Sequence, residues 1–148
     1  MRQAGTRIDL LIALVVVAFA GFTVVGCDSG RAEAEAACVA SGPEMIGLVL
    51  SQDINAMFEA RHPSAGTNLG REDLVQVALN LDDLGNVTTP GPDMDQARVD
   101  VRQGDAYCFY HYPFDSTKGP GHIELLFAQS EGEFGLLEIG IASAALGR

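Results

Sequence analysis

The sequence predicts an α+β fold in which one N-terminal amphipathic helix packs on an antiparallel meander sheet of five to six strands. Between residues 44 and 61 apolar side chains recur every three or four positions, which is the spacing of a helix with one buried face. Beyond residue 72 apolar and polar residues alternate in short stretches separated by turn-forming residues, as in an antiparallel sheet. We therefore expect residues 43–148 to form one small domain.

The helix is expected to begin at residues 41–44 (Ser-Gly-Pro-Glu), which have the form of a capping box with proline in the first turn. Its apolar stripe comprises Ile46, Val49, Leu50, Ile54, Met57 and Phe58. The helix should end at His62, because a residue that precedes proline is pushed out of the helical region. We interpret His62 as a cation at the helix C-terminus, where positive charge is favourable, rather than as a ligand.

Residues 72–84 admit two interpretations. Alternation favours a strand, which a turn at residues 82–86 joins to a second strand at Val87 and Thr88, so we expect a hairpin. The apolar residues of the first strand would be Val75, Val77, Leu79 and Leu81. A helix that ends at Gly85 also fits, and its apolar face would comprise Leu74, Val77, Ala78, Leu81 and Leu84.

Four further strands are expected at residues 97–102, 106–112, 122–129 and 134–142. A turn at residues 103–105 joins the first two, and a four-residue connection at 130–133 joins the last two. Between these pairs, residues 113–121 have the composition of a loop. The order of elements resembles cystatin-like and nuclear-transport-factor-like sheets, and also the head of a pilin. This resemblance is one of topology and implies no functional residues.

The N-terminal segment has the pattern of a secretory signal. Arg2 and Arg7 come first, and residues 10–26 then carry no charge. A membrane-spanning helix needs about 20 apolar residues. This run ends sooner, at Gly26, so we expect a signal segment rather than a spanning helix.

Residues 24–27 (Val-Val-Gly-Cys) resemble the lipobox of bacterial lipoproteins, although valine stands at the first position, where leucine is commonest. The resemblance implies removal of residues 1–26 and a diacylglycerol on the Cys27 sulfur. The alanine-rich composition that follows predicts a flexible, partly helical tether at residues 27–42. Each buried methylene contributes about 0.8 kcal/mol to membrane affinity, so two or three acyl chains anchor a protein firmly. Asp28 resembles a signal for retention on the cytoplasmic membrane, so we expect the protein in the bacterial envelope, facing the periplasm from that membrane.

Other N-terminal arrangements stay open. An uncleaved membrane anchor or an ordinary secretory signal would use the same apolar run. The segment after Gly5 also resembles the start of a type IV pilin, but Thr6 stands first and Asp9 fourth. Pilins usually begin with an aromatic residue or methionine and carry glutamate fifth. A pilin helix would also have to continue through residues 26–30, which are poor helix formers.

The sequence has three cysteines. If Cys27 is lipidated, Cys38 and Cys108 are an even pair in an oxidising compartment and are expected to form a disulfide. Such a bridge would restrict the unfolded chain by about 4 kcal/mol on the entropic model. A buried free thiol or an intermolecular bridge is the alternative. No Cys-x-x-Cys motif is present, which argues against redox catalysis.

The exported part of the chain is strongly acidic. The full chain has nine basic and twenty acidic residues, and Arg2, Arg7 and Asp9 precede Cys27, which leaves seven and nineteen and a formal charge of −12. Such a surface repels phosphate backbones and anionic headgroups, which excludes nucleic acid as a partner. The acidity suits solubility and would also attract a cationic partner.

The candidate binding site is the sheet face that points away from the helix. The residues expected to face the helix are Val99, Val101, Ile123, Leu125, Phe127, Leu137, Ile139 and Ile141. The opposite face would present Arg98, Asp100, Arg102, His122, Glu124 and Glu138. To this face residues 106–112 add either Tyr107, Phe109 and His111 or Cys108, Tyr110 and Tyr112. We favour the first set outside, because the sulfur of Cys108 prefers the interior.

A polar face with aromatic residues is suited to a small ligand or a peptide. The alternative is a solvated face with cross-strand ion pairs, such as Arg102 with Glu124. His111, His122 and Glu124 are also residues of the kind that bind zinc, but the sequence fixes no ligand geometry, and we expect no metal. Asp93 and Asp95 lack the further oxygens of a calcium loop.

Signatures of known enzymes are missing from the sequence. It has no Gly-x-Ser-x-Gly elbow, no His-Glu-x-x-His helix and no phosphate-binding glycine loop. We therefore expect a non-catalytic envelope lipoprotein without a cofactor, bound to the membrane through its lipid, whose domain binds an envelope protein or a small ligand. The alternatives are a pilin-type structural subunit and a small periplasmic enzyme with a scattered site.

Overall fold

The computed structural model describes residues 28–147 of the 148-residue chain. The expected signal segment at residues 1–26 and the expected lipid attachment at Cys27 lie outside these residues. By its internal contacts the chain divides into two units, residues 1–33 and 34–148, and the hydrophobic core lies within the second.

The fold is α+β, as predicted, and N-terminal helices pack on an antiparallel sheet that has five strands in the described part of the chain. The helices are α2 (Asp28–Leu50), α3 (Ile54–Glu59), the short 3-10 helix η1 (Pro63–Ala65) and α4 (Arg71–Leu84). The strands are β1 (Val87–Thr88), β2 (Arg98–Arg102), β3 (Asp105–Ser116), β4 (Gly119–Ser130) and β5 (Glu133–Ser143).

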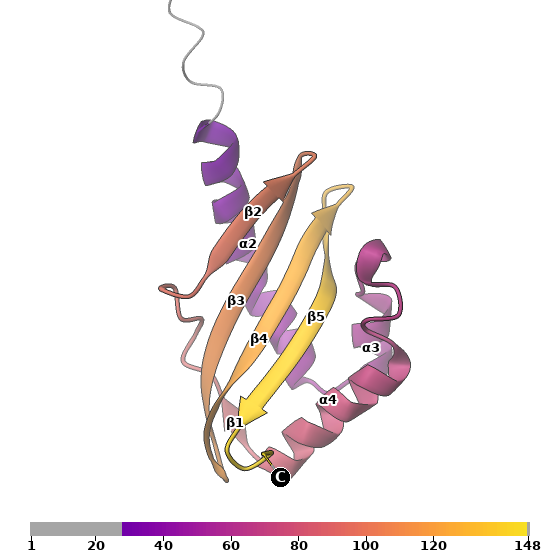
Figure 1. The fold of residues 1–148 in the computed structure, drawn as a ribbon, viewed down its shortest axis with the longest axis vertical. Coiled ribbons are helices and arrows are strands. Elements are labelled where there is room, and N and C mark those ends of the chain that lie inside the picture. The colour runs from indigo at the N-terminus through magenta and orange to yellow at the C-terminus, as the bar shows by residue number, and fades with distance from the viewer. Residues whose placement is uncertain (1–27, 148) are drawn as a thin grey trace, which may run out of the picture. The chain divides into compact units, whose positions relative to one another are not determined.

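Strand β3 organises the sheet. On one side it pairs with β4, which in turn pairs with β5 (Figure 1). On the other side it pairs with two short strands, β2 opposite residues 105–109 and β1 opposite residues 115–116. Residues 110–114 therefore have a strand partner on one side only.

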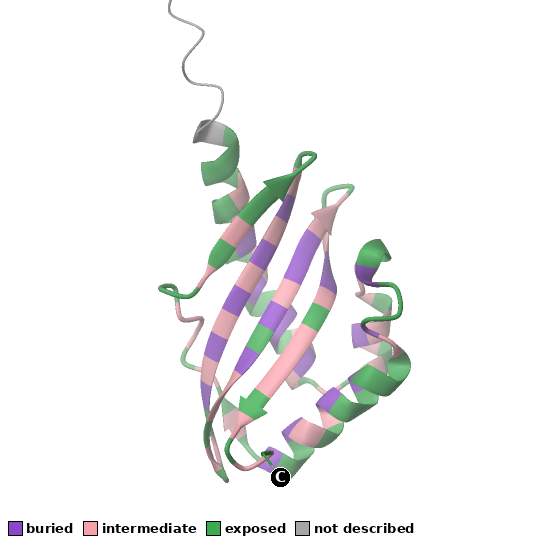
Figure 2. Cartoon of the chain, viewed as in Figure 1, coloured by how far each residue is buried: buried purple, intermediate pink, exposed green. Residues whose placement is uncertain are grey.

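One face of the sheet forms the core together with α2 and α4. Along β3, buried residues alternate with half-buried ones, which Figure 2 shows as alternating purple and pink bands. The buried residues of β3 are Ala106, Cys108, Tyr110, Tyr112 and Phe114. The predicted disulfide between Cys38 of α2 and Cys108 is present, and both cysteines are fully buried.

Helix α2 begins earlier than predicted. It starts at Asp28 rather than near Ser41, and it contains Pro43. Residues 34–42 therefore belong to a helix, so the segment predicted as a partly helical tether is helical throughout this range. The disulfide at Cys38 fixes this segment in the core, and tertiary packing of this kind stabilises a helix that contains an unfavourable proline.

A break divides the single helix predicted for residues 44–61 into two. Helix α2 ends at Leu50, and Gln52 has a positive φ of 57°. The side chain of Asp53 then accepts hydrogen bonds from the backbone N–H groups of Asn55 and Ala56, both at 3.0 Å. Asp53 thereby caps α3 and starts a new helix where the periodicity predicted a continuous one.

The hairpin predicted around residue 80 is wrong, because residues 71–84 form helix α4. At its start the Asp73 side chain accepts a hydrogen bond from the Gly70 N–H at 2.7 Å, and at its end Gly85 adopts a φ of 78°. The helical alternative is therefore the correct one. Its buried residues are Leu74, Val77, Leu81 and Leu84.

Residues 113–121 form strands rather than the predicted loop. The pairing of β3 with β4 continues from Pro113 to Ser116, and only Thr117 and Lys118 remain for the turn. Proline is tolerated at position 113 because the ring nitrogen points away from β4. The carbonyl of His111, two residues earlier, accepts a hydrogen bond from the Asp93 N–H on that same side.

A β-bulge shifts the register between β4 and β5. Phe127 lies opposite Leu136 and Leu126 lies opposite Glu138, so Leu137 has no partner in the ladder. Leu136 is fully buried in the place predicted for Leu137. Other residues predicted to face the helix do belong to the core or pack against it, namely Val99, Ile123, Leu125, Phe127, Ile139 and Ile141.

Two details at the ends of the predicted strands also differ from the prediction. Val101, predicted to face the helix, is 42% exposed because it lies near the open end of the two-stranded β2–β3 ribbon. The connection between β4 and β5 is shorter than predicted and consists of Glu131 and Gly132, both with positive φ. Such a two-residue connection suits the twist of the strands that it joins.

Candidate functional site

The nine residues proposed as a binding face lie on the side of the sheet opposite the core. Residues that pair across neighbouring strands share a face. The register pairs Arg98 with Phe109, Asp100 with Tyr107, Arg102 with Asp105, His111 with Glu124, Pro113 with His122 and Leu126 with Glu138. The outer face thus comprises Arg98, Asp100, Arg102, Tyr107, Phe109, His111, His122, Glu124 and Glu138.

One end of the outer face carries a charged cluster on β2. The Arg102 Nε donates to the Asp100 carboxylate at 2.7 Å, and its guanidinium lies 5.2 Å from the centre of the Tyr107 ring. The hydrogen bond to Asp100 raises the pKa of Arg102. The ion pair of Arg102 with Glu124, which the alternative interpretation expected, is not formed, because Arg102 lies opposite Asp105 whereas Glu124 lies opposite His111, six residues further along β3.

The middle of the outer face carries two imidazoles. The rings of His111 and His122 lie 4.4 Å apart, centre to centre, and are tilted by 34°. The Nδ1 of His111 lies 4.0 Å from a carboxylate oxygen of Asp93, and the Nε2 of His122 lies 3.8 Å from one of Glu124. The result is a row of carboxylate, two imidazoles and carboxylate across β3 and β4.

This row does not form a metal site. Within the described residues no group of three or more histidine, cysteine, aspartate and glutamate side chains is arranged to hold a metal ion. The two imidazoles contact each other as tilted rings, and the nitrogens that lie near a carboxylate approach different ones, Asp93 for His111 and Glu124 for His122. The arrangement is instead suited to stacking and to charge contacts with a ligand.

In the described part of the chain, none of the side-chain hydrogen bonds joins His111 or His122 to a hydroxyl group. Cys38 and Cys108 form a disulfide, so neither offers a free thiol. Tyr107 and Phe109 are half-buried beside the histidines. The outer face thus offers aromatic surface between charges of both signs.

His62 has a different role from the predicted one. It is almost fully buried, at 5% exposed, and it caps η1 by accepting a hydrogen bond from the Ser64 N–H on its Nδ1 at 3.0 Å. A nitrogen that accepts a hydrogen bond carries no proton, so His62 is not a helix-terminal cation. The sequence did contain a signal for this role, since proline directly after a residue marks a helix start as well as an end.

Sequence reasoning also missed what surrounds His62 and His111. The His62 ring lies 6.4 Å from the Tyr107 ring and covers one end of the outer face. Asp93 reaches His111 only because the loop between β1 and β2 folds back on β3. Both contacts join segments that are far apart in the chain, and no local pattern announces them.

The sequence matches no protein-family model, and no curated protein matches it. Among residues 28–147, no helix is both long enough and apolar enough to cross a membrane.

Proposed function

We propose that the protein is a membrane-anchored lipoprotein of the bacterial envelope whose folded domain binds a protein or a small ligand. The buried disulfide between Cys38 and Cys108 carries this proposal. It accounts for two of the three cysteines and leaves Cys27, in its lipobox-like setting, as the third. Structural disulfides persist in oxidising compartments, so the bridge supports an exported location.

The lipid would attach directly before a helix. Because α2 begins at Asp28, the residue after Cys27, the proposed anchor joins the helix without an intervening tether. The same aspartate supports retention on the cytoplasmic membrane with the domain in the periplasm. The outer face supports the binding role, since it leaves two adjoining imidazoles and half-buried aromatic rings accessible.

The intact mass of the membrane-extracted protein, before and after reduction, tests the anchor. We expect the loss of residues 1–26, the added mass of two or three acyl chains, and a gain of two hydrogens on reduction. Cys27→Ser should abolish the acyl mass and membrane retention, whereas Cys108→Ser should keep both. A Cys27→Ser protein that still partitions with membranes at its normal processed size would contradict the proposal.

A panel of generic hydrolase substrates tests whether the domain is non-catalytic. We expect no turnover by the purified protein. Turnover that disappears in His111→Ala or His122→Ala would instead identify the outer face as an active site.

A pilin-type structural subunit is the second candidate, and one observation favours it. Gly30, which was expected to interrupt a pilin helix, lies within α2, and this helix continues to Leu50 and packs on an antiparallel sheet. N-terminal sequencing of the mature protein separates the two candidates. A start at Thr6 supports the pilin, and a blocked, acylated Cys27 supports the lipoprotein.

A further inference from the structure

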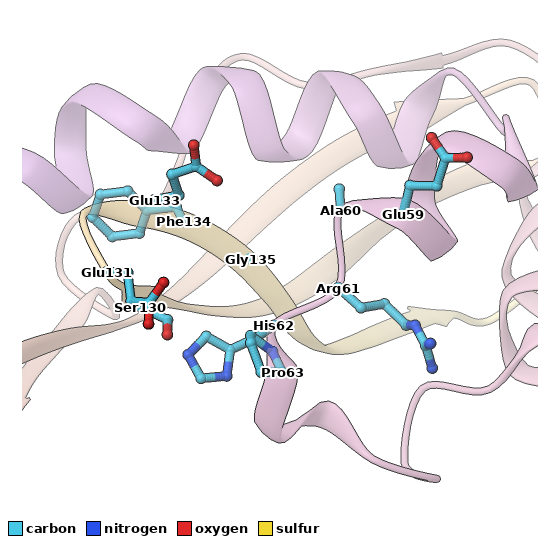
Figure 3. Close-up of a pocket in the computed structure, with 10 residues that line it drawn as sticks. All are labelled: Glu59, Ala60, Arg61, His62, Pro63, Ser130, Glu131, Glu133, Phe134 and Gly135. Atoms are coloured by element: carbon cyan, nitrogen blue, oxygen red, sulfur yellow. The ribbon is translucent and has the colours of Figure 1, made fainter.

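A hollow lies at the start of β5, away from His111 and His122 of the outer face. It has a volume of about 600 Å³ and is bounded by the end of α3, by the segment around His62 and by the turn between β4 and β5. The residues that matter for its chemistry are Glu59, His62, Ser130, Glu131, Glu133 and Phe134 (Figure 3).

His62 brings an unused hydrogen-bond donor to this hollow. Its Nδ1 accepts from the Ser64 N–H, so in this neutral imidazole the proton is on Nε2. The Nε2 is buried and has no hydrogen-bond partner in residues 28–147. Figure 3 shows the ring extending from the backbone toward Ser130 and Glu131. Because a buried donor without an acceptor is unfavourable, a ligand that supplies an acceptor here would gain affinity.

The charge of the hollow is negative. The side chains of Glu59, Glu131 and Glu133 are exposed at its rim, and no ion pair in the described chain neutralises them. Arg61 is the only cation among the lining residues, and Figure 3 shows its side chain extending away from His62 and Glu131.

Contacts elsewhere hold Arg61 in that orientation. Its Nε donates to the Phe58 carbonyl at 3.0 Å, and its Nη1 donates to the Leu69 carbonyl at 3.1 Å. Its guanidinium also lies 3.6 Å above the Phe58 ring. The guanidinium is therefore engaged by the Phe58 and Leu69 segments, and Glu131 and Glu133 face the hollow apart from it.

The edge of β5 supplies backbone groups for a peptide. The chain already uses this edge once, because Leu136 donates to the Ala60 carbonyl and accepts from the His62 N–H, both at 2.8 Å. Backbone groups of alternate residues point to the same side of a strand. The N–H and C=O of Phe134, two residues earlier, thus point to the same edge, within the lining of the hollow.

We propose that this hollow binds an extended basic peptide segment. An arginine or lysine side chain of the peptide lies beside Glu131 and Glu133, and a peptide carbonyl accepts from the Nε2–H of His62. Pairing with a strand edge provides affinity, and the side-chain contacts provide selectivity for positive charge. The inference does not depend on the lipid anchor or on the histidines of the outer face.

The probe is the peptide acetyl-Ala-Arg-Ala-Arg-Ala-amide, added to the full chain in detergent with the disulfide intact. We expect chemical-shift changes in the backbone amides of residues 59–62 and 130–135, and an affinity that falls with added salt. The matched control peptide carries citrulline, which has the shape of arginine without its charge. It should bind at least about tenfold more weakly.

Two single substitutions test the carboxylates. Glu131→Gln and Glu133→Gln should each weaken binding of the arginine peptide by about threefold, because each removes one exposed charge. Glu44→Gln makes the same change in charge on the exposed side of α2 and should leave the affinity unchanged.

Two substitutions of His62 separate its two nitrogens. Asparagine retains an acceptor for the Ser64 N–H but has no donor at the position of Nε2, whereas glutamine places an amide near that position. His62→Asn should weaken binding by about tenfold, and His62→Gln should largely retain it. Melting temperatures of both variants establish that they are folded. If His62→Asn fails to fold, the carboxylate variants and the citrulline peptide test the proposal without it.

Three results would overturn the proposal. They are equal affinity for the arginine and citrulline peptides, equal effects of Glu44→Gln and Glu131→Gln, and shift changes confined to the histidines of the outer face. None of these results bears on the mass measurement, so failure of this site and failure of the proposed anchor are distinguishable.

Discussion

Two tyrosines carry their hydroxyl groups into the core between α2 and the sheet. The hydroxyls of Tyr110 and Tyr112 have no hydrogen-bond partner in the described residues, and both side chains are almost fully buried. Burial raises the pKa of Tyr112 to about 12. Burial also raises the pKa of Tyr110, with a smaller contribution from the negative charge of Glu35. The core therefore opposes the tyrosinate form.

Stability should consequently fall at alkaline pH. The pKa of Tyr112 is higher in the folded than in the unfolded protein, so its contribution is complete below the unfolded value of about 10 and is lost as the pH rises toward 12. The loss should reach about 1.4 kcal/mol near pH 11, which corresponds to one pKa unit. Urea unfolding at mildly and strongly alkaline pH measures it.

Tyr112→Phe should remove this part of the alkaline loss, because phenylalanine does not ionise. Tyr107→Phe, a substitution on the outer face, is the control and should leave the loss as it is. An alkaline loss of the same size in Tyr112→Phe and in the parent would show that other groups are responsible.

Gly42 of α2 lies directly against Tyr112. A methyl group at position 42 would lie 2.7 Å from the Tyr112 hydroxyl oxygen, which is too close. Gly42→Ala should therefore lower the free energy of unfolding by about 1 to 2 kcal/mol in the parent. In the Tyr112→Phe background it should raise that free energy by about 1 kcal/mol, because alanine is the better helix former.

A thermodynamic cycle of the four proteins checks this change of sign. Gly47→Ala is the control, since nothing lies within 4 Å of a Cβ at that position of α2. It should stabilise both backgrounds by a similar amount. The same sign for Gly42→Ala in both backgrounds would contradict the assigned contact.

Among the elements, α4 shows why the spacing of apolar residues did not settle its structure. Val77 fits both a strand and a helix, so it does not discriminate between them. The discriminating residues are Val75 and Leu79, and they are 40% and 56% exposed. The helix is decided by its ends, where Asp73 bonds to a preceding N–H and Gly85 adopts a positive φ. Residues that cap the ends of a helix are therefore better evidence than a short alternation of apolar residues that fits both a helix and a strand.

The β3–β4 hairpin shows the opposite error. The alternation at its centre was predictable. The glycines of residues 113–121, however, include one that is required by a tertiary contact, and composition alone does not reveal such a contact. Gly121 lies against Phe114 and the Ala142 carbonyl, where a side chain would collide with both. A glycine at such a close approach and a glycine in a loop look the same in the sequence.

The crossing of the chain over the edge of β5 depends on another glycine. A Cβ at position 135 would lie 2.6 Å from the backbone nitrogen of His62 and 2.7 Å from its Cα. Gly135→Ala should therefore push the His62 segment off the sheet and lower the free energy of unfolding by about 2 kcal/mol or more. Chemical unfolding measures the change.

Gly140→Ala is the matched control on the same strand. Its nearest neighbour would be the Cβ of Glu124 at 3.5 Å, which is an ordinary contact. We expect it to be neutral or slightly stabilising, because glycine is a poor strand residue. Equal destabilisation by both substitutions would mean that the His62 segment is not held against Gly135.

At the scale of the whole molecule, one covalent bond joins the helical layer to the sheet. The disulfide connects residues 70 positions apart, so it restricts the unfolded chain strongly. The Cys38→Ala/Cys108→Ala double variant should lose about 4 kcal/mol of unfolding free energy. Urea unfolding of the parent with and without reductant should show a similar difference. The double variant should not respond to reductant, and a response there would point to another cause.

Whether a candidate binding surface could be predicted from the sequence depended on how far apart in the chain its contacting residues lie. The alternation of β3 and β4 placed His111, His122 and Glu124 on one face correctly, because alternation is a local property. The hollow at His62 could not be predicted, since it forms only where α3, the His62 segment and the β4–β5 turn meet. The bulge at Leu137 likewise depends on pairing between strands and leaves no mark in the sequence of one strand.

The position of the sulfur bridge also determines how the domain responds to tension. If the chain is pulled by its two ends, α2 can unwind only as far as Cys38 before the load passes to β3 through the bridge. The segment between the two cysteines then stays unstretched, and reduction would release about 240 Å of additional contour length. While the bridge is intact, the segment between Cys38 and Cys108 is thereby protected from being drawn out under load.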